Sequence, residues 1–391
     1  MNYILFDGTV RKALLPFTYT RPVADIRIGI LTIREKWERY LGNTTTTLTE
    51  DYLSEKYPLV EMAQNVMINA SFLPSDELAE QVSNLKENEG IFIGDEVIAF
   101  HTHQAQADIN FENYSKIEFS ENLLRIEHTW DIFSKNDVAI QADFDLITAD
   151  RKSQPISTTN QVIRPENIFI EEGAVVECCI LNATNGPIYI GKGAQMLEGS
   201  MVRGAFALCD NAVVKMGAKI YGATTVGPNG KVCGEISNSV IFGNSSKGHD
   251  GYLGNSVLGE WCNIGADSNN SNLKNNYDQV RLWSYETESF AKTGLQFCGL
   301  MMGDHSKCGI NTMFNTGTVV GVNANIFGSG FPRNFIPSFS WGGAAGFTSF
   351  LPKKAFVTAK VMMARRGVEF NDVEANILNH IFEITKKWRK G

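Results

Sequence analysis

Cysteine and histidine, the residues that build disulfide frameworks and many metal sites, are scarce in this sequence. The 391 residues include seven cysteines, an odd number without any Cys-x-x-Cys pair, and only six histidines. A disulfide framework or a structural zinc site is therefore not expected. A catalytic zinc site would need about three protein ligands. No such set is evident around His249 or His305, so we expect no metal site.

Long apolar runs and an excess of positive charge are also missing. No stretch of about 18 apolar residues occurs, so we expect no membrane-spanning helix. The net charge of −8 argues against a nucleic-acid partner held through its phosphates. The opening residues, MNYILFDGTVRK, lack the basic and then apolar pattern of a secretory signal, and we expect a cytoplasmic protein.

The sequence does contain a repeat with a period of six residues. Counted in sixes, eight consecutive positions are aliphatic or methionine: Ile190, Met196, Val202, Leu208, Val214, Ile220, Val226 and Val232. This period fits neither a helix nor a long alternating strand. It fits a chain that makes one short strand and one turn in each repeat, so that three repeats close a triangular coil. Stacked coils then bury their aliphatic residues in one continuous apolar column.

The six-residue pattern resembles the left-handed parallel β-helix of hexapeptide-repeat acyltransferases. The resemblance implies the left-handedness and a homotrimer with sites in the clefts between subunits. We predict an α/β domain over residues 1–150, the β-helix over 160–330, and a C-terminal cap with helices over 331–391. A long insertion, residues 267–296, interrupts the coils, and insertions of this length are usually functional.

A more specific resemblance rests on three motifs between residues 248 and 278. They are Gly-His-x-x-Tyr-Leu-Gly at 248–254, Asn-Ile-Gly-Ala at 263–266 and Asn-Tyr-Asp at 276–278. In this order they resemble the acetyltransferase half of the bifunctional N-acetylglucosamine-1-phosphate uridylyltransferase/glucosamine-1-phosphate N-acetyltransferase family. The resemblance implies a general base at His249.

The same resemblance implies a set of ligand contacts around this histidine. The residues predicted to bind the sugar phosphate are Glu235, Tyr252, Asn263, Asn276, Tyr277 and Arg281. Ala266 is predicted to contact the acyl-CoA. One residue departs from the family pattern, because Ser237 stands where the family has a phosphate-binding lysine. The basic residues nearby that could replace that lysine are Lys231, Lys247, Lys274 and Arg281.

Elementary chemistry independently favours a histidine at this position. An amine that attacks a thioester must lose a proton, and a base with a pKa near 7 removes it most effectively. Backbone N–H groups of a glycine-rich turn can stabilise the oxyanion that forms. No Ser-His-Asp or Cys-His series at a familiar spacing indicates a covalent acyl-enzyme. We therefore expect direct transfer from acetyl-CoA to an amino-sugar phosphate, with glucosamine 1-phosphate as the acceptor that the resemblance implies.

The N-terminal domain resembles a reduced sugar nucleotidyltransferase. Its segment LFDGTVRKALLPFTYTRP is similar to the start of those enzymes, where a glycine-rich turn holds the nucleotide phosphates. The nucleotide-binding candidates are Gly8, Arg11 and Arg21. Val23 replaces the usual lysine, and Ser71 replaces the carboxylate that would bind magnesium. Mg²⁺ and UTP are therefore expected only if this domain is active.

Three functions remain open at this point. The first is an acetyl-CoA-dependent N-acetyltransferase of UDP-N-acetylglucosamine biosynthesis, with uridylyltransferase activity in the N-terminal domain as an addition. The second is a sugar-1-phosphate nucleotidyltransferase, specific for UTP or a thymidine nucleotide, whose β-helix serves assembly. The third is a non-catalytic scaffold or sensor. The Gly-His-x-x-Tyr motif favours the first over the third, and the altered N-terminal motifs favour it over the second.

Overall fold

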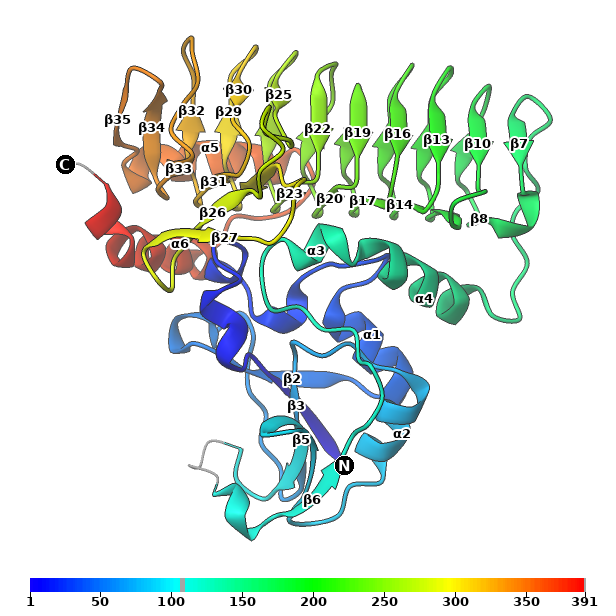
Figure 1. Ribbon diagram of the computed structural model, residues 1–391, viewed down its shortest axis with the longest axis vertical. Coiled ribbons are helices and arrows are strands. Elements are labelled where there is room, and N and C mark those ends of the chain that lie inside the picture. The colour runs from blue at the N-terminus through cyan, green and yellow to red at the C-terminus, as the bar shows by residue number, and fades with distance from the viewer. Residues whose placement is uncertain (106–109, 390–391) are drawn as a thin grey trace. The chain divides into compact units, whose positions relative to one another are not determined.

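The chain divides into two compact units, each of which is described on its own. The structure is a computed structural model that describes residues 1–105 and 110–389 (Figure 1). Unit 1 consists of Met1–Leu14, Thr18–Ile26 and Leu31–His128, and unit 2 consists of Leu15–Phe17, Arg27–Ile30 and the chain from Thr129 onward. No helix among the described residues is long and apolar enough to cross a membrane.

Unit 1 is an α/β domain built on one mixed sheet of six strands. The strand order is β2-β1-β3-β5-β4-β6. The strands are β1 (Asn2–Phe6), β2 (Thr45–Leu48), β3 (Asn65–Asn69), β4 (Glu89–Ile93), β5 (Glu96–Thr102) and β6 (Ser115–Glu118). The central strands β1 and β3 are parallel to each other, and β3 is buried along its whole length. Such continuous burial is typical of a strand that is covered on both faces.

Helix α1 (Ile33–Leu41) shows how local sequence fixes an element of unit 1. Thr32 and Glu35 form a reciprocal capping box at its start, and Gly42 ends it in a left-handed conformation. Trp37 is fully buried and donates its indole N–H to the carbonyl of Phe72, at 3.0 Å. The second helix of the unit, α2 (Asp76–Ser83), begins at the Ser75 cap.

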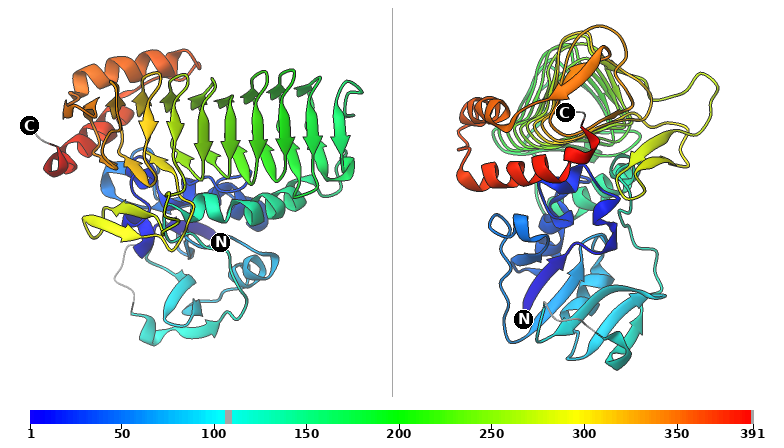
Figure 2. Two further views of the ribbon diagram at one scale, coloured as in Figure 1. Left: turned by 45° about the horizontal axis from the view of Figure 1, so that its top comes forward. Right: turned by 90° about the vertical axis from the view of Figure 1, so that its left-hand side faces the viewer.

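Unit 2 is built around a parallel β-helix with three faces, seen end-on in Figure 2. The first face contains β7 (Gln161–Ile163), β10 (Ile180–Asn182), β13 (Met201–Arg203), β16 (Lys219–Tyr221), β19 (Glu235–Ser237) and β22 (Tyr252–Gly254). The second face contains β8 (Ile168–Ile170), β11 (Ile188–Ile190), β14 (Phe206–Leu208), β17 (Thr224–Val226), β20 (Val240–Ile241), β23 (Val257–Leu258), β28 (Leu300–Met302), β31 (Thr318–Val320) and β33 (Phe335–Ile336). The predicted left-handed parallel β-helix is confirmed.

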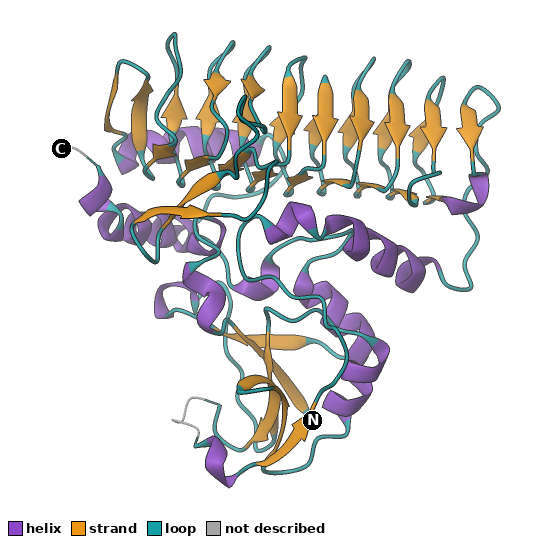
Figure 3. Ribbon diagram, in the orientation of Figure 1, coloured by secondary structure: helices purple, strands orange, loops and turns teal. Residues whose placement is uncertain are grey.

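The third face carries the β-helix on to its C-terminal end. It contains β9 (Val175–Val176), β12 (Gln195–Met196), β15 (Val213–Val214), β18 (Lys231–Val232), β21 (Ser246–Lys247), β24 (Asn263–Ile264), β29 (Lys307–Cys308), β32 (Asn325–Ile326), β34 (Ser340–Gly343) and β35 (Gly346–Ser349). The last two strands form an antiparallel hairpin. Two helices follow, α5 (Pro352–Ala364) and α6 (Asp372–Ile384), purple in Figure 3.

The six-residue period corresponds to the apolar column inside the β-helix. Ile190, Met196, Val202 and Leu208 are each at most 2% exposed and belong to one continuous cluster. Stacking in register explains the column, because β14 places Leu208 directly between Ile190 and Val226. Each coil therefore adds aliphatic surface to a core that is already apolar.

Helices α3 (Asp131–Ser134) and α4 (Asn136–Thr148) belong to unit 2 and lie against its second face. The contact depends on Asn136, which is fully buried. Its side-chain amide donates to Ala223 O and to Thr225 Oγ1, at 3.2 and 3.1 Å, and its carbonyl oxygen accepts the N–H of Gly29. A buried amide with all its groups bonded in this way fixes the helices in one position.

The long insertion is structured rather than irregular. It contains β25 (Asn269–Asn270), which pairs with β30 (Met313–Phe314), and an antiparallel hairpin of β26 (Arg281–Ser284) and β27 (Ser289–Lys292). The hairpin extends away from the triangular prism in the end-on view of Figure 2. Trp283 of the hairpin stacks on Phe335 of the second face, with ring centroids 4.2 Å apart.

Candidate functional site

The corner between β21 and β22, residues 248–251, presents His249 to an open cavity of about 620 Å³. The imidazole is exposed. The other lining residues come from the same corner of five successive coils: Leu197, Lys215, Met216, Cys233, Gly248, Asp250, Ala266 and Asp267. His249 and the predicted acyl-CoA residue Ala266 therefore line one cavity.

A lysine whose side chain lies inside the apolar column forms hydrogen bonds with the backbone of this corner. Lys247 is 1% exposed and pairs in register with Val232, so its side chain takes an inward position that the repeat normally gives to an aliphatic residue. Its ammonium donates to the backbone carbonyls of Cys233 at 3.2 Å, Asp250 at 3.1 Å and His249. Burial lowers the pKa of Lys247. An ammonium satisfied by backbone carbonyls in this way is unavailable to a substrate phosphate.

A second lysine holds the same corner from the outside. The ammonium of Lys215 donates to the carbonyl of Gly248 at 2.9 Å. Together, Lys215 and Lys247 bond the carbonyls of three consecutive corner residues, 248 to 250. Charge-assisted hydrogen bonds of this kind are stronger than neutral ones. The two lysines thus fix the backbone that carries His249.

Gly251 is required where this corner turns back into β22. Its φ is 108°, a value that side-chain-bearing residues rarely adopt, and a Cβ atom there would lie 2.2 Å from the carbonyl oxygen of Ser268. The turn can therefore approach the next coil only with glycine at this position.

Tyr252 lies on the first face in a network of side-chain hydrogen bonds. Asn272 donates its amide to the Tyr252 hydroxyl at 2.9 Å and to Asn255 Oδ1 at 2.8 Å. The ring crosses Gly254, where a Cβ atom would lie 2.2 Å from the hydroxyl. Burial raises the pKa of Tyr252, so the side chain remains a neutral hydroxyl. It is suited to orient a ligand and not to act as the base.

Glu235 is the neighbour of Tyr252 on the first face, in direct register. Its carboxylate accepts a hydrogen bond from the Tyr221 hydroxyl at 2.6 Å, which raises the pKa of Tyr221 to about 12. Ser237, at the position of the missing lysine, is buried and interacts with both tyrosines. The hydroxyl of Tyr221 therefore holds the Glu235 carboxylate beside Tyr252, and residue 237 supplies no lysine there.

None of the predicted sugar-phosphate residues is among the described residues that line the His249 cavity, Glu235 and Tyr252 included. Asn263 begins β24, in register with Ser246. Asn276, Tyr277 and Arg281 are exposed on the insertion, and none of them is among the described residues that line the cavity. None of the four predicted substitutes for the lysine lines it either, whereas Lys215, which the sequence reasoning missed, does.

In unit 1, a cavity of about 400 Å³ lies beyond the end of β1, where the nucleotide was predicted. Gly8 and Arg11 line it, but the guanidinium of Arg11 is already engaged. It forms a 2.6 Å ion pair with Asp7 and donates to the carbonyls of Thr18 and Arg21. Burial raises the pKa of Asp7 in spite of this pair. The side chain of Arg11 therefore links segments within unit 1 by hydrogen bonds. Arg21 is buried as well.

Asp7 and Ser71 are poorly suited to bind Mg²⁺, although the carboxylates of Glu50 and Asp51 also line this cavity. Asp7, the carboxylate nearest β1, accepts hydrogen bonds from the Val23 N–H at 2.6 Å, from Arg11 and from Thr49. Ser71 supplies only a hydroxyl, which donates to Asn69. In residues 1–105 and 110–389, no three acidic, histidine or cysteine side chains come together as a metal would require. We derive no catalytic step through this ion.

Comparison with known proteins finds one matching family model and several curated relatives. Residues 3–152 match the family model of the sugar nucleotidyl transferases. The chain is 36% identical over 93 residues to the bifunctional protein GlmU of Methanocaldococcus jannaschii, a match that covers 23% of this chain and 21% of the relative. It is 27% identical over 203 residues to the bifunctional protein GlmU of Methanococcus maripaludis strain C5, covering 51% and 42%. The chain thus spans less than half the length of these curated relatives.

The fold and these matches define a class of protein in which a sugar nucleotidyl transferase domain precedes a parallel β-helix. Over part of its length, the chain is similar to the bifunctional GlmU proteins. The resemblance drawn from the motifs around His249 is thereby supported. One position of the candidate site departs from that resemblance. Ser237 stands where the family has a phosphate-binding lysine, and the ammonium of Lys247 is bonded inside the protein, so neither of these two described residues offers a cation to a phosphate.

Proposed function

We propose that this protein transfers the acetyl group of acetyl-CoA to the amine of an amino-sugar 1-phosphate, with glucosamine 1-phosphate as the acceptor. The observation that carries the proposal is the exposed His249 on a corner fixed by two lysines, beside a cavity of about 620 Å³. A cavity of this size is large enough for a small substrate. Because the relatives are matched over less than half their length, the activity rests on this site.

The reaction requires one base and a polar environment for the oxyanion. His249 removes a proton from the amine as its nitrogen attacks the thioester carbonyl, which forms a C–N bond and a tetrahedral oxyanion. The C–S bond then breaks, and the protonated imidazole returns its proton to the departing sulfur of coenzyme A. The corner N–H groups at 248–251 are candidates to stabilise the oxyanion.

Binding of the acceptor is assigned to the first face. The Tyr252 hydroxyl and the Glu235 carboxylate are neighbours there, and both accept and orient hydroxyl groups of a sugar well. Lys215 is the cationic residue of the His249 cavity, and we propose that it, instead of residue 237, faces an anionic group of a substrate. We further propose a homotrimer, in which neighbouring subunits complete the cavity with Asn276 and Arg281 of the insertion.

An assay of thiol release tests the proposal. The full chain is mixed with acetyl-CoA and glucosamine 1-phosphate, and free coenzyme A is measured. We expect turnover that falls by about 10²–10⁴-fold in His249→Ala. His380→Ala changes an exposed histidine on α6 and serves as the matched control, with unchanged turnover expected. Equal rates in wild type and His249→Ala would contradict the proposal.

Uridylyl transfer by unit 1 is a second candidate, favoured by the match of residues 3–152 to the sugar nucleotidyl transferases. The engaged guanidinium of Arg11 weighs against it. Release of pyrophosphate from UTP and N-acetylglucosamine 1-phosphate, with Mg²⁺ present, is the direct test. If pyrophosphate forms, unit 1 is catalytic. If it does not, unit 1 serves another role.

A further inference from the structure

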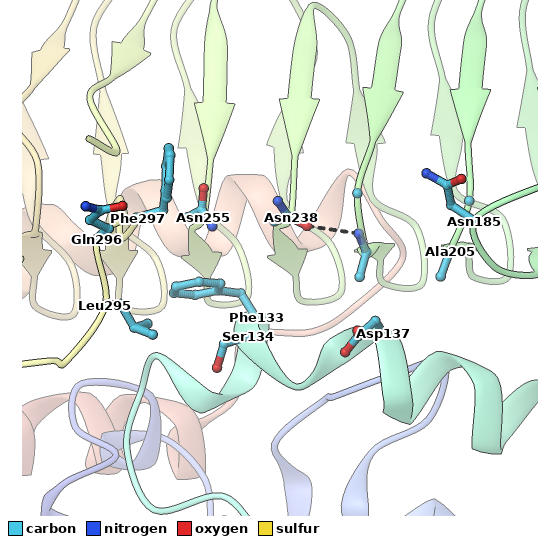
Figure 4. A pocket seen from close by; sticks show the side chains of 13 residues that line it. Phe133, Ser134, Asp137, Asn185, Ala205, Asn238, Asn255, Leu295, Gln296 and Phe297 are labelled. Carbon is cyan, nitrogen blue, oxygen red and sulfur yellow. Dashed lines mark hydrogen bonds between the residues drawn. The ribbon is translucent and has the colours of Figure 1, made fainter. Parts of the chain in front are cut away.

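A second cavity in unit 2, of about 460 Å³, lies at the edge between the first and second faces. One wall is formed by α3 and α4, and the floor by the turns that follow five successive strands of the first face, from β10 to β22 (Figure 4). Residues 295–297, where the insertion returns to the coils, close one end. This groove is separate from the cavity of His249, with which it shares no lining residue.

The floor of the groove is recessed because the coil turns require glycine. A Cβ atom at Gly222 would lie 2.3 Å from Asn238 Oδ1, and one at Gly204 would lie 2.3 Å from the carbonyl oxygen of Gly186. Larger residues are excluded at both positions, so the groove stays open along its length. Since adjacent coils are about 4.8 Å apart, the four steps from Asn185 to Asn255 span about 19 Å.

Side-chain amide groups on this floor keep N–H donors that a ligand could use. Asn238 Oδ1 accepts the N–H of Ala223 at 3.1 Å, and Asn255 Oδ1 accepts from Asn272 at 2.8 Å. The amide nitrogen of Asn238 also donates to the Ser237 hydroxyl at 3.4 Å, which leaves it one further N–H, and the amide nitrogen of Asn255 lies on the neighbouring coil. Figure 4 shows both asparagines in the middle of the pocket and Asn185 toward the end opposite Phe297.

The charge of the groove selects against phosphorylated ligands. Among the described residues that line it there is no lysine or arginine, and Asp137 is its one carboxylate. Ser134 adds a hydroxyl on the same wall. Coenzyme A, nucleotides and sugar phosphates need cationic partners, which the cavity of His249 has in Lys215 and this groove lacks. Its ligand should therefore be uncharged and able to accept and donate many hydrogen bonds.

An aromatic ring at one end narrows the ligand class further. Phe297 is 46% exposed, and Figure 4 shows it near the buried Phe133. An exposed ring in a groove that also carries amide and carboxylate groups offers an apolar surface and hydrogen-bonding partners together. The C–H face and the hydroxyl edge of a pyranose ring match these two kinds of surface. We propose that the groove binds a short, uncharged, linear oligosaccharide along the β-helix axis.

Binding of three trisaccharides to the full chain tests this proposal independently of acetyl transfer. Cellotriose, maltotriose and tri-N-acetylchitotriose are titrated by calorimetry and by saturation-transfer NMR. We expect one or more of them to bind, and Ser134→Trp, which fills the groove from an exposed position, to weaken binding by about tenfold or more, equivalent to about 1.4 kcal/mol. Phe297→Ala is expected to weaken it similarly.

The matched control is Val138→Trp, which adds the same ring to an exposed position of α4 outside the groove. Its affinity should stay within about twofold of wild type, and circular dichroism should show all three variants folded. The proposal is overturned if none of the trisaccharides binds, or if Ser134→Trp and Val138→Trp behave alike. It is equally overturned if an extended peptide or a nucleotide binds in the groove and excludes the sugars.

Discussion

Replacement of Lys247 by methionine tests whether its ammonium positions the His249 corner, separately from its effect on the stability of the β-helix. Methionine has a similar length and is apolar, so it suits a position that is 1% exposed within the apolar column. The change removes the ammonium that bonds the carbonyls of Cys233, His249 and Asp250. The packing around the side chain is largely kept, and what is lost is the anchor of the corner.

The expected loss of stability is modest because two effects oppose each other. A buried carbonyl that loses its partner costs about 1–3 kcal/mol. Three carbonyls lose the ammonium, and that of Cys233 belongs to a buried residue. Methionine also avoids the desolvation of a charge, the effect that lowers the pKa of Lys247. We expect a net destabilisation of about 1–2 kcal/mol, or a few degrees in Tm.

The expected loss of activity is much larger than the loss of stability. A displacement of about 1 Å at a catalytic group can cost about 10²-fold in rate. In Lys247→Met we therefore expect kcat for acetyl transfer to fall about 100-fold while KM changes little. The thiol-release assay gives both constants, and calorimetry gives Tm. The pH profile of the residual activity should keep its shape, because the base is still His249.

Lys231→Met is the matched control. It makes the same chemical change on the neighbouring strand β18, one residue before the inward position, where the lysine is exposed. We expect it to leave kcat within about twofold of wild type. If Lys247→Met keeps a wild-type kcat, or if the two variants lose the same activity, Lys247 does not position His249.

Three further predictions follow from the described contacts. In Gly251→Ala, the methyl group would meet the carbonyl of Ser268 at 2.2 Å at a φ of 108°, so we expect a destabilisation of about 1–3 kcal/mol, and an unchanged Tm would refute the close approach. Tyr252→Phe removes only the hydroxyl to which Asn272 donates; KM for the sugar phosphate should rise about tenfold with Tm kept, and an unchanged KM would remove Tyr252 from the site. Although burial opposes the effect, hydrogen bonds from Arg151 and Tyr189 hold the pKa of Glu171 below its usual value of 4.5. The ionised carboxylate therefore adds stability above about pH 4.5 that is lost as the pH falls through the lowered pKa, and Glu171→Gln should flatten the acid side of the Tm profile. Identical profiles for the two proteins would contradict this assignment.

Much of the fold could be predicted because its cause is local and repeated. The aliphatic residues at Ile190, Met196 and Val202 recur every six positions, and only a stack of short strands and turns buries them all on one side. The Gly-His-x-x-Tyr motif likewise indicated which corner to inspect. Its position next to a cavity is in line with that prediction, while the catalytic roles of these residues await the assays above.

The partners of the site side chains could not be predicted, since they come from other coils. Lys247 stands six residues after Ile241 and so fits the six-residue count. A charged side chain is not expected inside an apolar column, and only the pairing with Val232 shows that the side chain of Lys247 points inward. Asn272 reaches Tyr252 only because β25, which precedes it, contacts β22 of the first face. Arg11 looks like a phosphate ligand until the fold places Asp7 and two carbonyls around it.

The sequence alone determined that this protein stacks coils into a prism and carries a histidine in a glycine-rich corner. Periodic burial and glycine-rich turns are properties of neighbouring residues, which a sequence displays directly. The tertiary structure decided which charged side chains are bonded inside the protein and which remain available to a ligand. That choice depends on which carbonyls and carboxylates surround each ammonium or guanidinium, and for Lys247 and Arg11 some of these groups belong to residues from other turns of the chain.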